Sequence, residues 1–501
     1  MKRNWLVLLV CCVLVVSNFS VSMSYVLQIE AFDNSLRNEP TFFIPEGGQR
    51  ISINNGEILT LRGEIYGKVQ TRSEVGWLYY PVKSKAKVNV VFKKGKELSD
   101  RKVDSLVLIF AIVRKSDSLS VRIPAVFPGM EKVPANFKND IQGWNFSREY
   151  LEENAGKLLT LDLDFGEACS LKCPHCFRHN GTIDHSKNRS LSHLEIFSLI
   201  RKATNLGLES IKILGAGEPF ENRFFLGFLQ EMQAKGIKVN IFTKAHVLGD
   251  DALAQKYFNL SAEDLIGTIK DLDVSLNVGF NSFNPEIQDS MVGVQGYTAK
   301  RNRALELLSE AGFNQGQPTR LCLAIVPITK QNIHEIYEIY VWARERNIYP
   351  VTTVSMCAGR AQDSWQDLTP SPEELIALYT RINIYNIEKG ISTLDELKRN
   401  DISSYAGGCP CHQVACGMYI TSRGIVLRCP GDDTTIFGDV YKTKLKDIWQ
   451  NSENYLVRRG IFNCHCPPKD GKSIPLDFYN KVLENVVRHF KPNIYLNQPV
   501  A

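Results

Sequence analysis

Three cysteines share one short stretch of the chain. They lie in "ACSLKCPHCFRHNG" as Cys169, Cys173 and Cys176, and His175 directly precedes the last of them. Thiolates with this spacing can surround one metal centre, but three of them leave one position of a four-iron cluster unfilled. A closed zinc site would need a fourth ligand, which His175 or His179 could supply. The spacing therefore allows an open iron–sulfur site or a closed zinc site.

A glycine-rich turn forms the second candidate. In "ILGAGEPF", Gly215, Gly217 and Pro219 surround Glu218. Glycine lets bare backbone approach a ligand, and a single carboxylate can accept charge-assisted hydrogen bonds from a primary ammonium group. Taken alone, the stretch is typical of an ordinary turn, so its meaning depends on where the fold places it.

The region around both stretches alternates between strand-like and amphipathic helical segments. Six such βα units lie between residues 157 and 360. With right-handed crossovers they form a parallel sheet, either open or curled toward a barrel. In both forms the chemistry lies at the carboxyl ends of the strands. The cysteine stretch follows the first predicted strand and Glu218 follows the second, so we expect them on one rim.

The regions before and after residues 157–360 do not show this alternation of strands and helices. Residues 25–127 contain short segments rich in β-branched and aromatic residues, which predict an antiparallel sandwich or barrel. That region has no cluster of His, Cys or carboxylates, so a packing or docking module is expected. We predict an apolar segment at 1–24, a β-rich accessory domain at 25–150, the barrel at 151–370 and a cysteine-rich domain at 371–501.

The composition narrows the class of protein. Lys and Arg total 59 against 54 for Asp and Glu, and this thin charge of +5 gives no case for a nucleic-acid partner. The 13 cysteines of the 501 residues fall mainly in tight clusters. A disulfide scaffold would spread its cysteines along a small secreted domain, so clustering in a long chain favours metal ligation.

Together, the motifs resemble the radical S-adenosylmethionine (radical SAM) superfamily. The cysteine trio fits its CxxxCxxC motif, "GAGEP" fits its Gly-Gly-Glu-Pro motif, and "VSLN" resembles its fourth-strand signature. The resemblance implies a partial (β/α)6 TIM-like barrel in which the trio holds a [4Fe-4S] cluster and S-adenosylmethionine binds the open iron. By the same resemblance, one electron would cleave the cofactor to a 5'-deoxyadenosyl radical, which would abstract hydrogen from a substrate C–H bond.

The same resemblance implies roles for four further residues. Gly217 and Glu218 would hold the methionine ammonium, Ser275 a ribose or carboxylate oxygen, and His175 would lie near the adenine. This chain also departs from the family. The third strand ends in "FTKAH" where relatives usually have Thr-Asn-Gly, and "DSMVGVQGY" lacks the arginine that many relatives use for the cofactor carboxylate. Arg301 or Arg303 would take the place of that arginine.

The C-terminal cysteines indicate a second metal site. Cys416, Gly424 and Cys429 resemble the hairpin that opens a SPASM domain or its shortened twitch form. The long middle cysteine run of a full SPASM domain is missing, so one auxiliary [4Fe-4S] cluster is expected rather than two. A structural zinc knuckle is the alternative, because four thiolates suit either metal. The other auxiliary ligands would come from Cys409 or Cys411 and from Cys464 or Cys466.

Cys357 lies near the end of the sixth predicted strand, on the rim that carries the trio. An unpaired thiol there could return a hydrogen atom to a substrate radical. The simpler interpretation is a small buried hydrophobe, because free cysteine is among the most buried residue types.

The N-terminal segment resembles a signal for export, whereas the metal sites indicate a protein that stays inside the cell. Lys2 and Arg3 precede an apolar run, Trp5 to Val16, which resembles a secretion signal and is short for a membrane span. Iron–sulfur clusters are assembled inside cells, so export would conflict with the metal sites. We therefore favour a misplaced start, with Met23 as the true beginning, or a peripheral membrane association, with the catalytic domains in the cytoplasm.

These interpretations converge on a radical SAM enzyme, an oxidoreductase or modifying enzyme with one auxiliary cluster. It would oxidise, epimerise or otherwise modify a peptide or small-molecule substrate, and a low-potential donor such as flavodoxin or ferredoxin would supply electrons. The alternative is a zinc-binding interaction or scaffold protein that cleaves no cofactor.

Overall fold

The computed structural model divides the chain into two compact units, Met1–Ile123 and Pro124–Ala501. In the first unit it describes the backbone of eight strands. In the second it describes residues 139–144, 146–178, 188–409, 411, 413–457, 466 and 468–490. We expected the β-rich region to extend to residue 150. Instead its compact unit ends at Ile123, and Ile141 and Trp144 pack with strand residues of the barrel.

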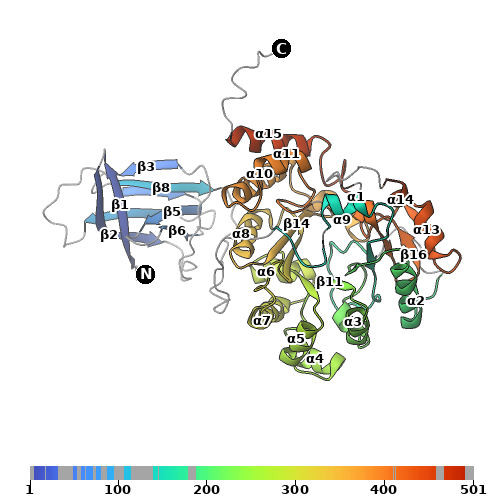
Figure 1. Cartoon of the computed structure of the whole chain (residues 1–501). Coiled ribbons are helices and arrows are strands. Elements are labelled where there is room, and N and C mark those ends of the chain that lie inside the picture. Colours follow the sequence, from blue (N-terminus) through green and yellow to red (C-terminus); the bar gives the residue numbers. More distant parts are fainter. Residues whose placement is uncertain are drawn as a thin grey trace, which may run out of the picture. The chain divides into compact units, whose positions relative to one another are not determined.

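The described strands of the first unit form two four-stranded antiparallel sheets, in agreement with the predicted sandwich-like domain (Figure 1). One has the order β1 (Trp5–Val16), β2 (Phe19–Ala31), β7 (Lys87–Lys94), β4 (Ile58–Arg62). The other has the order β3 (Gln49–Ile53), β8 (Leu106–Val113), β5 (Glu64–Gln70), β6 (Val75–Tyr80).

The apolar N-terminal run is strand β1, which pairs along its whole length with β2. We expected this run to lie apart from the β-rich region, so the structure corrects that division. Among the described residues, no helix has the length and apolar character needed to cross a bilayer.

The core of the second unit is a sheet that contains six parallel strands in chain order, which confirms the predicted partial barrel. Almost all residues of these strands are buried, because helices cover the sheet on the outside (Figure 1), and the first four strands alternate apolar with polar residues. The strands are β9 (Thr160–Leu163), β10 (Ser210–Ile213), β11 (Lys238–Thr243), β12 (Ser275–Gly279), β13 (Leu321–Ile328) and β14 (Tyr349–Val354). The helices are α2 (His193–Thr204), α3 (Phe225–Ala234), α4 (Asp251–Phe258), α5 (Ala262–Asp271), α6 (Pro285–Val292), α7 (Tyr297–Glu310) and α8 (Ile333–Arg344).

Local signals in the sequence begin several of these helices. Ser192 caps α2 in a capping box with Glu195, and the side chains of Asp250 and Ser261 cap α4 and α5. Each cap satisfies a backbone N–H that the first helical turn leaves unpaired. The first residues of these helices are therefore defined by local sequence.

The C-terminal region continues the barrel sheet. Strand β15 (Gly417–Ile420) pairs in parallel with β9, and β16 (Ile425–Leu427) and β17 (Ile436–Asp439) follow it in an antiparallel arrangement. The remaining helices are α1 (Arg148–Glu153), α9 (Ala361–Leu368), α10 (Pro372–Glu388), α11 (Leu394–Asn400), α12 (Gln413–Cys416), α13 (Leu445–Asn451), α14 (Glu453–Val457) and α15 (Phe478–Phe490).

A buried carboxylate joins this extension to the barrel rim. Asp164, directly after β9, accepts hydrogen bonds from the Tyr419 hydroxyl (2.5 Å), the Ser422 N–H (3.1 Å) and the Ala216 N–H (2.6 Å). Ala216 belongs to the glycine-rich turn, whereas Tyr419 and Ser422 belong to the C-terminal region. One side chain therefore positions both segments.

Candidate active site

A cavity of about 170 Å³ opens at the carboxyl ends of the barrel strands. All three cysteines of the trio line it, together with His175 and the glycine-rich turn. Five further lining residues, which we call the apolar wall, are Phe242, Val326, Val351, Met356 and Tyr405, and the polar residues Asn277, Thr353 and Ser355 also line the cavity. The rim predicted from the order of the strands is therefore present.

The loop that carries the trio is anchored to two other segments of the barrel. The Ser170 N–H and hydroxyl both donate to the Glu221 carboxylate, at 2.9 and 2.6 Å, and the Lys172 N–H donates to the Val292 carbonyl at 2.9 Å. Leu171 packs against Val292 in a small apolar cluster. Contacts of Ser170, Leu171 and Lys172 thus fix the loop, and the three thiols line the cavity.

Glu218 is buried in the glycine-rich turn and borders the same cavity. It accepts hydrogen bonds from the Thr243 hydroxyl (2.5 Å) and from the Lys244 N–H (2.8 Å). Burial raises the pKa of its carboxyl group, and these hydrogen bonds oppose that rise. Gly217 has φ +80°, and a Cβ there would lie 2.8 Å from the Gly166 carbonyl oxygen, so the turn requires glycine at this position.

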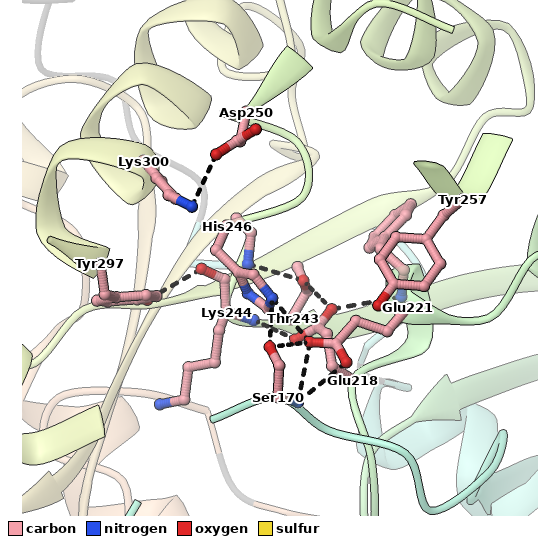
Figure 2. A network of polar contacts seen from close by, with 12 residues as sticks. Ser170, Glu218, Glu221, Thr243, Lys244, His246, Asp250, Tyr257, Tyr297 and Lys300 are labelled. Carbon is pink, nitrogen blue, oxygen red and sulfur yellow. Dashed lines mark hydrogen bonds and ion pairs between the residues drawn. The ribbon is translucent and has the colours of Figure 1, made fainter. Parts of the chain in front are cut away.

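Behind Glu218 lies a second buried carboxylate that sequence reasoning missed. Figure 2 shows Glu221 between Ser170 and His246, and His246 Nε2 lies 2.8 Å from Glu221 Oε1. Both side chains are about 5% exposed. His246 ends the "FTKAH" stretch that departs from the family pattern, so the departure supplies a partner that holds the cysteine loop.

Of two residues predicted to contact the cofactor, His175 lines the cavity and Ser275 does not. His175 lines the cavity, and burial lowers the pKa of its ring to about 3, so the imidazole is neutral there. Ser275 is the first residue of β12, at the amino end of the strand, and its hydroxyl donates to the Gln142 carbonyl at 2.9 Å. Because the cavity lies at the carboxyl end, we withdraw Ser275 as a cofactor contact.

Neither of the two arginines considered for the cofactor carboxylate lines the cavity. Arg301 is buried away from the cavity and donates to Gln288 and to the Ser282 carbonyl, whereas Arg303 pairs with Asp251 at 2.7 Å. The Lys244 side chain lines the cavity instead, and in Figure 2 it extends away from the hydrogen-bond network. No described residue accepts a hydrogen bond from its ammonium group.

Cys357 does not line this cavity. It borders a separate polar cavity together with Arg428, Asp432 and Lys472, while its neighbour Met356 belongs to the apolar wall. A hydrogen atom given to a substrate radical must come from a group inside the reaction cavity, so the structure contradicts the proposed donor role.

We therefore expect Cys357→Ala to leave product formation unchanged. The measurement is the ratio of product to 5'-deoxyadenosine, with a Cys322→Ala variant as a control for loss of a buried thiol. A variant that still produced 5'-deoxyadenosine but formed no product would restore Cys357 as the donor.

The C-terminal cysteines separate into two groups. Cys411, Cys416, Cys429 and Cys466 lie close enough to influence one another electrostatically, and Cys411 interacts with each of the other three. The Cys409 thiol instead donates to the Asn139 carbonyl, at 2.7 Å, and none of its main interactions involves another cysteine. Cys464 lies outside the described residues. Among the described residues, no three His, Cys, Asp or Glu side chains are gathered around one metal-ion position.

Comparison with known proteins defines the class. Residues 163–343 match the model of the Radical SAM superfamily, and residues 409–467 match the SPASM iron–sulfur cluster-binding domain. The chain is therefore a radical SAM enzyme with a C-terminal SPASM domain, and a zinc-binding scaffold is not favoured. Its cofactors are S-adenosylmethionine and a [4Fe-4S] cluster, with auxiliary iron–sulfur binding in the SPASM domain.

Its curated relatives include mycofactocin maturases. MftC of Mycolicibacterium smegmatis is 25% identical over 320 residues, which is 61% of this chain and 73% of the relative. MftC of Mycobacterium tuberculosis is 23% identical over 315 residues, with the same shares. Among solved structures, Streptococcus suis SuiB bound to the precursor peptide SuiA is similar with 17% identity and a TM-score of 0.43, over 62% of this chain and 68% of that one.

The described residues fit these cofactors. Three thiols share one cavity with a carboxylate and the bare backbone of Gly217, which are the groups needed to hold an iron–sulfur cluster and an amino acid side by side. When bound, the cluster and S-adenosylmethionine supply the radical chemistry, and the protein supplies orientation and exclusion of water.

Proposed function

We propose that this enzyme removes hydrogen from an aliphatic or aromatic side chain of a peptide. The observation that carries the proposal is the apolar wall. A sugar or other polyol needs a polar partner for nearly every carbon, and burying its hydroxyl groups without partners would be costly. An apolar side chain, by contrast, gains free energy from contact with Phe242, Val351 and Tyr405.

The mycofactocin maturases support a maturation role for this chain. In the cavity, the trio and Glu218 hold the cofactors, and the apolar wall contacts the substrate. In this proposal a small low-potential carrier, flavodoxin or ferredoxin, reduces the cluster. Cys169, Cys173 and Cys176 hold the radical SAM cluster, and the four neighbouring C-terminal thiols hold the auxiliary cluster.

We further propose that Lys244 binds the carboxylate of S-adenosylmethionine. Its ammonium group faces the cavity, and a Cβ at Gly279 would lie 3.0 Å from its Nζ, so the glycine gives the lysine side chain room. Burial raises the pKa of the Cys173 thiol, and the nearby Lys244 charge opposes that rise. A cation beside the cluster-binding cysteines is suited to an amino-acid carboxylate.

The substrate class can be tested by isotope transfer from a cell extract. The producing organism is grown in deuterated medium, and its extract is separated into a peptide fraction and a small-metabolite fraction. With reduced enzyme and unlabelled cofactor, we expect deuterium in 5'-deoxyadenosine, measured by mass spectrometry, from the peptide fraction only. Protease treatment of that fraction should abolish the transfer. Transfer from the small-metabolite fraction alone would contradict the proposal.

A further inference from the structure

Two lysines are buried beneath the cavity, beside the C-terminal cysteines. Lys469 is 0% exposed and Lys212 is 5% exposed. Burying an ammonium group is costly unless an anion compensates its charge. No carboxylate of the described residues lies within 4.0 Å of either ammonium group. Their burial therefore calls for another source of negative charge.

The direct partners of both lysines are neutral. Lys469 Nζ donates to the Thr353 hydroxyl at 2.7 Å and lies 4.9 Å from the centre of the Tyr405 ring. Lys212 Nζ donates to the Gln413 side-chain oxygen at 3.3 Å and lies 4.8 Å from the Trp144 ring. A hydroxyl, an amide and aromatic faces stabilise a cation only in part.

Asp162 is the carboxylate that interacts with Lys212, and it compensates the charge incompletely. It is 3% exposed, and one of its oxygens has no hydrogen-bond partner among the described residues. Burial raises its pKa to about 6, although the Lys212 charge opposes the rise. Lys469 has no comparable carboxylate among its described contacts, so at least one buried positive charge remains.

The thiols next to the lysines become anionic when they bind iron. The Lys469 N–H donates to the Cys466 carbonyl at 2.8 Å, and Gln413, the partner of Lys212, begins the short helix that ends at Cys416. Iron binds cysteine as the thiolate. The loaded site therefore supplies the negative charge that the surroundings of the lysines lack.

We propose that Lys212 and Lys469 neutralise the auxiliary iron–sulfur site and raise its reduction potential. The reduced state carries one more negative charge than the oxidised state, so buried cations stabilise it, and net charge is one of the factors that set such potentials. Uptake of that electron forms and breaks no bond. The proposal rests on the SPASM assignment and is independent of the peptide substrate.

The position of Lys469 connects the raised reduction potential of the auxiliary site with the reaction cavity. Its two described side-chain partners, Thr353 and Tyr405, both line the cavity, while its backbone contacts Cys466. Lys469 thus lies between the cavity and the auxiliary thiols. A site with raised potential at this position is suited to accept an electron released on the cavity side.

The test is a reductive titration of the full-length, iron-loaded enzyme, followed by electron paramagnetic resonance. We expect Lys469→Met and Lys212→Met each to lower the midpoint potential of the auxiliary cluster, and the double variant to lower it further. The potential of the radical SAM cluster should stay unchanged. Lys472→Met is the matched control, because this exposed lysine lies three residues from Lys469 and its change removes the same charge.

A second measurement separates charge compensation from simple packing. In the iron-free full-length protein, Lys469→Met should raise the melting temperature, because the buried ammonium group lacks its anion there. In the loaded protein the same change should lower it or leave it unchanged. An unchanged auxiliary potential, an equal shift in Lys472→Met, or equal destabilisation of both forms would overturn the proposal. A wild-type protein without an auxiliary cluster would overturn its premise.

Discussion

Replacing Lys244 with methionine should weaken S-adenosylmethionine binding roughly 10- to 100-fold, since a hydrogen bond to a charged group contributes about 1.5–3 kcal/mol. The methylene chain is largely preserved, so packing along Gly279 should persist. The measurement is equilibrium binding to the loaded enzyme, made in parallel with decarboxylated S-adenosylmethionine. The wild type should prefer the natural cofactor, and this preference should be smaller in the variant by about the factor that its affinity loses.

Two further variants make this result specific to the cavity cation. Lys244→Arg should recover most of the affinity, because a guanidinium group also pairs with a carboxylate. Lys256→Met removes a charge from the exposed face of α4 and should bind like the wild type. If Lys244→Met kept the full wild-type preference for the carboxylated cofactor, the assignment of Lys244 would be wrong.

Changing Gly215 to alanine should strongly reduce both the stability and the catalytic activity of the enzyme. A Cβ at this position would lie 1.8 Å from Asp164 Oδ1 and 2.7 Å from the Tyr419 hydroxyl. Relieving that overlap must displace either the glycine-rich turn or the buried Asp164 contacts, and overpacking of this kind costs about 1–3 kcal/mol or more. We expect a lower melting temperature and strongly reduced formation of 5'-deoxyadenosine.

Gly227→Ala is the matched control for this prediction. Gly227 lies within α3, and a Cβ there would meet no atom within 4 Å. Alanine favours a helix by about 1 kcal/mol over glycine, so this variant should be at least as stable as the wild type and fully active. Wild-type melting and turnover in Gly215→Ala would show that the turn is less constrained than the contacts with Asp164 indicate.

Short-range signals in the sequence determined the class of this enzyme and the location of its cavity. The spacing of Cys169, Cys173 and Cys176 and the GAGEP turn are local patterns, and alternating strands and helices predict a parallel sheet. Because parallel strands end at one edge, two loops separated by some forty residues could be assigned to the same rim. That inference needs no knowledge of side-chain direction, which is why it was confirmed.

The side chains that face the cavity were decided only by the tertiary structure. Ser275 matched a family signature, yet it lies at the amino end of β12, because the strand continues to Gly279 before it reaches the rim. Arg301 and Arg303 lie on α7, where one is buried away from the cavity and the other pairs with Asp251. Lys244, in a stretch that departs from the family, supplies the cation instead.

The auxiliary site shows the same division between sequence and structure. Its cysteines were recognisable as a metal-binding set, but the choice between Cys409 and Cys411 depends on which way an irregular loop turns. The two lysines gave no signal in the sequence, because an isolated lysine is normally an exposed residue. Their burial follows from packing between β9, β10, β14 and segments more than a hundred residues distant. Local spacing thus determined which chemistry the chain can perform, whereas long-range packing decided which charges surround it.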